Sequence, residues 1–359
     1  MRATTTHLRR VTAVAATLAA AAVATTATAA PAAQPGLNLQ PVKAYLVQHT
    51  TRLTGFTRDF DAVAGRYYAA AKATGFDYQR LWATKRAQVR RDLERAKALW
   101  VQGNPFYERV EGVVAGTPSL SVYDVILDAG SSAAEDPASA VPFDLKLRNG
   151  KVLRKPGNLY NLTEGMLWGT LPAYVAAKVD LDGDGKVEFG EVLPEANAFA
   201  AAADAFVLYG GKLHASARAW KPTASDAFTS VVVMTPTMSE YFGQWKVSRF
   251  VLGDNAKGAS FNVVSRLSDI GDILGGLRVI YAGIRPAIAT VDPQQAAQTK
   301  KELDALYAFV ARLRKQERSG KRFTPQQAEI LGRDAQERAT AIAGQVTQAA
   351  ARLKVKIAQ

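Results

Sequence analysis

The sequence predicts an all-α protein of stacked helical bundles into which one small β-hairpin is inserted. Apolar residues recur at helical spacing through most of the chain, strong helix-start signals mark its last third, and one short stretch alternates as β-strands do. With 359 residues, of which 48% are hydrophobic and 21% are charged, the chain can bury two modest cores or one large one. It contains no cysteine, which excludes disulfide scaffolds, thiol catalysis and thiolate metal sites.

Residues 1–29 read as a secretory signal peptide. Three arginines precede an apolar, alanine-rich stretch over residues 11–23, and the small residues at 27–29 are typical of a cleavage site. We therefore expect a secreted or extracytoplasmic protein that, without a cysteine to acylate, carries no lipid anchor. Removing residues 1–29 lowers the net charge from +13 to +10, because this segment holds three arginines and no acidic residue.

Long helices open the mature chain. The spacing of apolar residues predicts a helix over residues 42–74, which Gly75 ends, and a second helix over residues 78–101. Residues 103–105 read Gly-Asn-Pro and should stop the second helix, after which residues 106–114 form a shorter helical piece.

The stretch from residue 116 to residue 156 differs from the helical segments because it is rich in Gly, Ser, Pro and Asp. Within it, residues 143–147 and 151–154 alternate in hydrophobicity around Asn149-Gly150. This dipeptide readily adopts the positive φ angles of a two-residue hairpin turn, so we expect one small β-hairpin here.

Helices resume at about Leu159. A further helix is expected over residues 224–251, bent at Pro236. Another should span residues 263–290, although two consecutive glycines at 275 and 276 weaken it.

The last third of the chain carries the clearest helix starts. At Asp292 and again at Thr324, a capping side chain is followed by Pro at the first helical position and Gln at the third. These signals predict two antiparallel helices, over residues 293–319 and 325–356.

Residues 180–191 fill the twelve-residue calcium loop of an EF-hand without a mismatch, reading Asp-Leu-Asp-Gly-Asp-Gly-Lys-Val-Glu-Phe-Gly-Glu. Calcium takes six to eight oxygen ligands, and side chains at alternate positions of a tight loop can point inward together. Gly185 occupies the position where the chain must turn through a conformation that a Cβ would disfavour. The predicted calcium ligands are the side chains of Asp180, Asp182, Asp184, Glu188 and Glu191 and the carbonyl group of Lys186.

We expect this loop to join an entering helix over residues 173–179 to a leaving helix over residues 192–209, as a single EF-hand helix-loop-helix. We find no second such loop in the sequence. The unpaired loop should therefore be supported by the rest of its own chain, or pair with the same loop of another copy in a homodimer. Extracellular calcium sites bind at about 10⁻⁴ to 10⁻³ M, which favours a structural brace over a sensor. The alternative is an acidic surface turn that binds nothing.

The positive net charge predicts attraction to polyanions. Outside a cell these are wall polymers and acidic lipids, so a wall-associated scaffold that binds anionic cell-wall polymers is one hypothesis. We expect no nucleic-acid partner, because the chain has no groove-reading motif or aromatic-basic platform. We also expect no membrane span, because no segment after the signal peptide approaches the roughly 20 apolar residues that a membrane helix needs.

Signals of catalysis are scarce. Only two histidines follow the signal peptide, and paired-histidine zinc motifs, a Gly-x-Ser-x-Gly elbow and phosphate-binding loops are absent from the sequence. The acidic pairs Glu108/Glu111 and Asp269/Asp272 stand at helical spacing, which is typical of a solvated helix face. We therefore assign no catalytic residue and favour a protein that is not an enzyme.

Residues 159–169 read Leu-Tyr-Asn-Leu-Thr-Glu-Gly-Met-Leu-Trp-Gly and resemble the Gly-x-His-x-x-Glu segment, followed by Leu-Trp-Gly, of imelysin-like proteins. That family includes the periplasmic component of bacterial ferrous-iron uptake systems. The resemblance implies an exported all-helical fold of two bundle-like halves, here residues 30–220 and 221–359. For some members it implies metal binding or peptidase activity.

The motif glutamate falls on Glu164 and the motif histidine on Asn161. The neutral amide oxygen of asparagine is a weak ligand for iron or zinc, which prefer an imidazole nitrogen. Our first hypothesis is therefore an exported calcium-binding protein on an imelysin-like helical scaffold. The alternative is an iron-uptake component or a metal-dependent peptidase of the imelysin type that uses Glu164.

Overall fold

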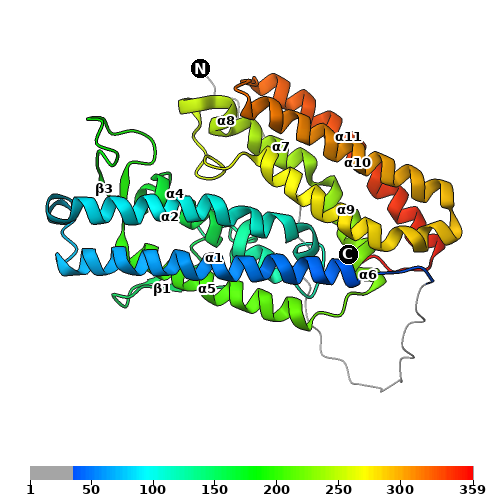
Figure 1. Ribbon diagram of the computed structural model, residues 1–359, viewed down its shortest axis with the longest axis horizontal. Coiled ribbons are helices and arrows are strands. Elements are labelled where there is room, and N and C mark those ends of the chain that lie inside the picture. Colours follow the sequence, from blue (N-terminus) through cyan, green and yellow to red (C-terminus); the bar gives the residue numbers. More distant parts are fainter. Residues whose placement is uncertain (1–34, 359) are drawn as a thin grey trace.

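Helices account for most of residues 35–358, the part of the chain that the computed structural model describes. This confirms the predicted all-α fold. The predicted signal peptide over residues 1–29 lies outside the described residues. Figure 1 shows an elongated molecule whose long helices run side by side along its length.

The first two helices form a long antiparallel pair, α1 (Gln40–Ala73) and α2 (Tyr78–Val114). The prediction that residues 103–105 stop the second helix is wrong, because α2 continues through Pro105. Gly103 lies against the ring of Phe56 in α1, so closely that a Cβ there would meet the ring at 2.3 Å. Packing of this kind outweighs the one helical hydrogen bond that the proline removes.

A short helix, α3 (Ser121–Asp124), and a π-helical turn, η1 (Val125–Ala129), lead into the irregular region. There the predicted hairpin is confirmed: β1 (Leu145–Lys146) pairs in antiparallel fashion with β2 (Val152–Leu153). The predicted two-residue turn is wrong, because the Leu147 N–H donates to the Lys151 carbonyl at 2.8 Å and three residues, 148–150, lie between this pair. Of the Asn149-Gly150 dipeptide, Gly150 alone has a positive φ, of 86°, a conformation that side chains with a Cβ disfavour.

The helix-loop-helix predicted around residues 180–191 is wrong. After α4 (Leu159–Trp168) and a 3₁₀ turn, η2 (Pro172–Tyr174), the loop is entered by strand β3 (Val175–Lys178) and left by strand β4 (Val192–Pro194). The two strands pair in antiparallel fashion, so the fold has a second hairpin that the sequence analysis did not predict.

Local chemistry explains why helices do not flank this loop. Proline at 172 and at 194 and valine at 175 and 192 favour extended backbone over a helix interior. The next helix, α5 (Ala196–Ala219), begins only after Glu195, whose side chain accepts the Ala198 N–H at 2.7 Å as an N-cap.

The chain then forms a second group of helices. The predicted helix over residues 224–251 is broken near Pro236 and again at Ser248, whereas the helices predicted from Asp292 and Thr324 are confirmed with those residues as N-caps. The elements are α6 (Ala224–Met234), η3 (Thr235–Thr237), α7 (Met238–Val247), α8 (Arg249–Leu252), η4 (Gly253–Asn255), α9 (Arg266–Val291), α10 (Pro293–Arg318) and α11 (Pro325–Arg352).

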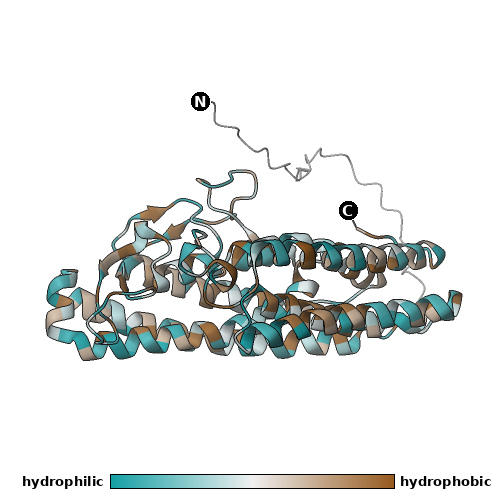
Figure 2. Ribbon diagram, turned by 90° about the horizontal axis from the view of Figure 1, so that it is seen from above, coloured by the Kyte–Doolittle hydropathy of each residue, from teal (hydrophilic) through white to brown (hydrophobic). Residues whose placement is uncertain are grey.

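Helix packing divides into two neighbourhoods that meet at α2 and α9. Helix α1 packs against α2 and α5, while α9 packs against α2 and α10, and α11 packs against α6, α7 and α10. Figure 2 shows hydrophilic and hydrophobic residues interleaved along each long helix, as expected of helices with one buried face. The predicted boundary between halves at residues 220/221 stays a prediction.

None of the helices in residues 35–358 combines the length and the apolar character that a membrane-spanning helix requires.

Candidate functional site

Residues 180–191 form the tip of the β3–β4 hairpin, here called the acidic loop. The strand pairing holds the two ends of the loop together, with Lys178 opposite Val192 and the Val179 N–H donating to the Glu191 carbonyl at 3.1 Å. In Figure 1 this hairpin projects beyond the helices near the turn between α1 and α2. The acidic loop is therefore anchored at its base and open at its tip.

Three of the predicted calcium ligands come together in the acidic loop. Carboxylate oxygens of Asp180, Asp182 and Asp184 lie within 4.8 Å of one another. Asp180 also organises the backbone, because its two oxygens accept the N–H groups of Gly183 at 2.7 Å and Gly185 at 3.1 Å. Gly185 has a φ of 89°, as predicted for the sharp turn at this position.

Glu191 lies behind these three aspartates. Its Oε1 accepts the N–H groups of Leu181 at 2.8 Å and Asp182 at 3.0 Å, and its Oε2 accepts the N–H of Glu188 at 2.7 Å. These backbone N–H groups, that of Glu188 first, hold the pKa of Glu191 below its ordinary value. The carboxylate thus fastens the two ends of the loop to each other, and one lone pair of Oε2 is left for a ligand.

The other two predicted ligands lie at the surface. The side chain of Glu188 is exposed, and so is Lys186, whose N–H donates to Asp184 Oδ1 at 2.8 Å. The structure therefore brings together three of the six predicted ligands and leaves the remaining three outside that group.

Cationic side chains surround the acidic loop. Arg86 of α2 donates from Nη2 to the Asp180 carbonyl at 3.1 Å and lies 3.6 Å from Asp180 Oδ2. Lys97 Nζ, also from α2, donates to the Gly190 carbonyl at 2.5 Å. The guanidinium group of Arg249 in α8 lies 3.9 Å from the centre of the Phe189 ring. The loop therefore joins α2 to α8.

A second group of carboxylates lies in the interior and was not predicted. It comprises Glu108 and Glu111 of α2, Asp128 of η1 and Asp269 of α9, all at most 6% exposed, and we call it the buried acidic centre. The prediction that the Glu108/Glu111 pair faces solvent is wrong. A signal was available in the sequence, because Glu111 shares a helix face with Tyr107 and Val114.

One cation, Arg266 of α9, lies in the buried acidic centre. Its guanidinium group is 3.1 Å from Asp269, 3.6 Å from Glu108 and 3.7 Å from Asp128, and it packs over the rings of two aromatic residues. Burial raises the pKa of all four carboxyl groups, that of Asp269 to about 7. Four carboxyl groups around one guanidinium cannot all be ionised cheaply in the interior.

Several polar atoms of this region lack a hydrogen-bond partner within the described residues. They are Oε2 of Glu108, Oε2 of Glu111 and the hydroxyl group of Tyr160, and all three are buried. A small cavity of about 10 Å³ is lined by Glu108, Asp128 and Tyr160 among others. Such a space holds about one water molecule or one ion.

Glu164, the motif glutamate, lines the same small cavity. Its Oε1 accepts the Asn262 N–H at 2.8 Å and its Oε2 accepts the Phe261 N–H at 3.0 Å, so it holds the segment before α9 in place. Burial raises the pKa of Glu164 to about 7, although these two N–H groups oppose the rise. With both oxygens engaged by the backbone, Glu164 is placed as a positioning group.

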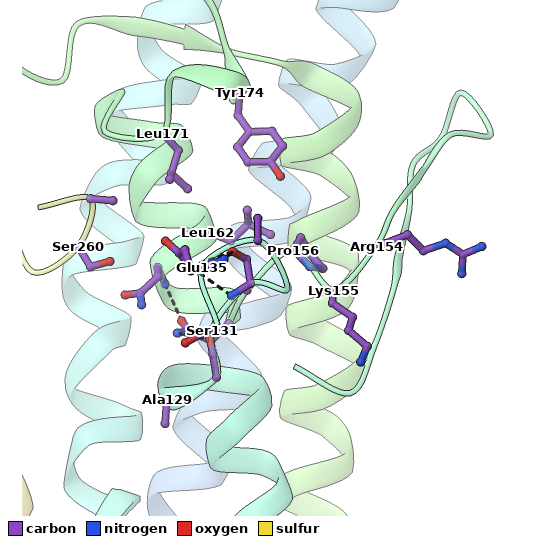
Figure 3. A pocket seen from close by; sticks show the side chains of 17 residues that line it. Ala129, Ser131, Glu135, Arg154, Lys155, Pro156, Leu162, Leu171, Tyr174 and Ser260 are labelled. Atoms are coloured by element: carbon purple, nitrogen blue, oxygen red, sulfur yellow. Dashed lines mark hydrogen bonds between the residues drawn. The ribbon is translucent and has the colours of Figure 1, made fainter. Parts of the chain in front are cut away.

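Asn161 lines both this small cavity and a larger one of about 290 Å³. Figure 3 shows the larger cavity beside α4, with Tyr174 and Leu171 on one side and Ser131 and Glu135 on another. Asn161 therefore stands between an open cavity and the buried acidic centre, at the position where the motif has histidine.

Comparison with known proteins supports one family. A search of curated proteins finds no match. The family model described as imelysin (peptidase family M75) matches residues 45–353, which is most of the chain and includes the acidic loop, the buried acidic centre and Glu164. The chain therefore belongs to the imelysin family.

Proposed function

We propose that the protein is an exported member of the imelysin family that binds calcium through the acidic loop, as a structural brace. The observation that carries the proposal is the convergence of the Asp180, Asp182 and Asp184 carboxylates within 4.8 Å of one another. Carboxylates held so close repel one another in the absence of a cation, and calcium prefers such hard oxygen ligands. The signal peptide predicted over residues 1–29 supports the extracytoplasmic location.

The contacts of the acidic loop support a bracing role. The loop touches Arg86 and Lys97 of α2 and Arg249 of α8, so an ion that orders the loop would stiffen contacts to both helices. At free calcium tenfold above the dissociation constant, binding would add about 1.4 kcal/mol to the free energy of unfolding. Glu191, Glu188 and the Lys186 carbonyl would complete the shell after a local rearrangement.

A double variant tests the proposed ligands. Asp180→Asn with Asp184→Asn removes two charges and keeps one acceptor oxygen at each position, although the asparagine at position 180 can accept only one of the two N–H groups that Asp180 accepts. The rise in melting temperature with millimolar calcium should disappear. The matched control, Asp59→Asn with Glu337→Gln, removes two exposed charges that make no hydrogen bond or ion pair within residues 35–358 and should respond as the wild type does. An equal calcium response in both double variants would refute the assignment.

A second candidate function is the binding of a hard divalent or trivalent cation, such as iron, in the buried acidic centre. The specific observation in its favour is the set of buried oxygens, on Glu108, Glu111 and Tyr160, that have no hydrogen-bond partner within residues 35–358. Glu108, Glu111 and Asp128 also offer oxygens within 4.8 Å of one another. Arg266 would have to share its carboxylates with such an ion, which would weaken the binding.

Titration of the Asp180→Asn, Asp184→Asn variant with Mn²⁺ and Fe²⁺ tests this candidate separately from the acidic loop. Saturable binding that is lost on the further change Glu108→Gln, but kept on Glu188→Gln, would support a site in the buried acidic centre. The absence of any saturable binding would reject it.

A further inference from the structure

The seam between α9 and α10 carries two neighbouring cavities that are both strongly basic. The first, of about 200 Å³, is lined by Arg278, Arg285 and Lys300 with one acid, Asp304. The second, of about 260 Å³, is lined by Arg314, Lys315 and Arg318 with one acid, Asp272. Together they present six cationic side chains against two carboxylates. We call this surface the basic seam.

The acids of the basic seam are already engaged. Asp304 accepts from Arg278 Nε at 2.6 Å and from Lys300 Nζ at 2.5 Å, and Asp272 lies 3.5 Å from Arg109. No ion pair within residues 35–358 holds the remaining four cations, which are Arg285, Arg314, Lys315 and Arg318. The basic seam therefore has positive charge that the described part of the chain does not neutralise.

A buried donor points to a ligand in the second cavity. Nε of Arg314 is buried and has no hydrogen-bond partner within the described residues. A buried N–H without an acceptor costs free energy. Because water does not reach this Nε, the guanidinium group would have to turn for an anion in the cavity that Arg314 lines to supply the acceptor.

The two cavities lie in one line. Helices α9 and α10 are consecutive, antiparallel neighbours (Figure 1), and Arg278 links the cavities because it lines the first and stacks at 4.5 Å on Tyr307, which lines the second. From Gly271 to Arg285 the helix rises about 21 Å at 1.5 Å per residue. The basic seam is thus long enough to contact several negative charges of one linear polyanion.

We propose that the basic seam binds a linear polymer of phosphate groups, with Arg285, Arg314 and Arg318 as contacts. Guanidinium groups bind phosphate oxygens through paired N–H donors. A phosphate presents oxygens in several directions, so it meets donors from both walls of a cavity at once. Two cavities in line suit a chain, whereas a flat anionic membrane surface would not enter them.

The experiment is a titration with labelled inorganic polyphosphate long enough to span both cavities. Arg285→Gln, Arg314→Gln and Arg318→Gln together should weaken binding at least tenfold. The salt dependence should also change, with the slope of log affinity against log salt lowered by about 2, since each phosphate contact contributes about 0.7. The control is Arg80→Gln, Arg91→Gln and Arg95→Gln, three exposed α2 residues, which removes the same charge and should change the affinity less than threefold.

Several results would overturn the proposal. An equal loss of polyphosphate affinity in the two triple variants would mean that polyphosphate is attracted by net charge alone. No loss of affinity in either variant would exclude the basic seam as the binding site. Vesicles of acidic lipid that compete fully with polyphosphate would assign the surface to membranes. A further variant, Arg285→Gln with Lys315→Gln, separates loss of binding from misfolding, because both side chains are exposed and their replacement should not disturb the fold. This variant should also bind polyphosphate more weakly than the wild type. Unchanged affinity would count against the proposal.

Discussion

At the scale of single residues, Glu191 shows how one carboxylate can hold a loop closed. Three backbone N–H groups, two from the start of the acidic loop and one from its end, converge on its two oxygens. The side chain is only 8% exposed, so water cannot easily replace these bonds. Glu191 therefore shapes the loop before any ion binds.

Glu191→Gln should lower the free energy of unfolding at pH 7 by about 1–2 kcal/mol, because the amide nitrogen cannot accept an N–H that the carboxylate accepts. The pKa of Glu191 is lowered in the folded state, so its ionised form stabilises the protein above its ordinary value of 4.5. This stabilisation is lost as the pH falls through the lowered pKa, and the difference between variant and wild type should shrink there.

Urea unfolding in the presence of a chelator measures this difference. The control is Glu188→Gln, in the same loop, whose exposed side chain makes no hydrogen bond within the described residues; it should shift stability by less than about 0.5 kcal/mol. Equal effects of the two changes would show that the bonds of Glu191 do not stabilise the loop.

The contribution of the buried acidic centre to stability depends on pH in the opposite way to that of Glu191. Burial raises the pKa of Asp269 to about 7, so between about pH 4 and pH 7 the folded protein binds more protons there than the unfolded chain does. This centre should therefore make the metal-free protein less stable as the pH rises through that range. Asp269→Asn, which cannot ionise, should make the decline smaller, as measured by urea unfolding at pH 5 and pH 7.5, whereas Asp59→Asn should leave it unchanged.

At the scale of elements, α2 connects the two candidate ion sites. Its N-terminal part supplies Arg86 and Lys97 to the acidic loop, and its C-terminal part supplies Glu108 and Glu111 to the buried acidic centre. Helix α9 crosses the C-terminal part and adds Asp269 and Arg266. Close contact between α2 and α9 is therefore needed to assemble the buried acidic centre.

Two adjacent glycines of α9 test this contact. A Cβ at Gly276 would lie 2.4 Å from the carbonyl oxygen of Arg109 in α2, whereas the nearest atom to a Cβ at Gly275 is 3.9 Å away, in Tyr307. Gly276→Ala should lower the free energy of unfolding by about 1–3 kcal/mol through overpacking.

Gly275→Ala is the matched control for that change. Because its Cβ would make only ordinary contacts, it should leave stability unchanged or raise it by up to about 1 kcal/mol through better helix propensity. Thermal melts of the two variants and the wild type measure the change in stability. Equal destabilisation by both would show that the close approach of α9 to α2 is not the cause.

At the scale of the whole molecule, the sequence predicted best what depends on local chemistry. The N-caps at Asp292 and Thr324 and the hairpin around Gly150 are local signals, and all three were predicted correctly, although the hairpin turn has three residues where two were predicted. The predictions were wrong where contacts with distant parts of the chain determine the length of a helix or the burial of a side chain. Helix α2 passes Pro105 because of packing against other helices. Glu111 is buried where α9 packs against α2 and where the Tyr241 hydroxyl group of α7 donates to its carboxylate.

In the acidic loop, the local arrangement was predicted correctly and the backbone that flanks it was not. The positions of Asp180, Asp182 and Asp184 and the turn at Gly185 followed from the twelve-residue pattern. The flanking strands did not, because that pattern describes the loop and not the backbone that holds it. The family was indicated by the motif around Glu164, even though Asn161 replaces the motif histidine.

The most direct test of calcium binding is a calorimetric titration of residues 30–359, freed of chelator, with calcium chloride. We predict saturable heat with one ion per chain, a dissociation constant of about 10⁻⁴ to 10⁻³ M and a higher melting temperature in the loaded protein. No heat and an unchanged melting temperature up to several millimolar calcium would contradict the account.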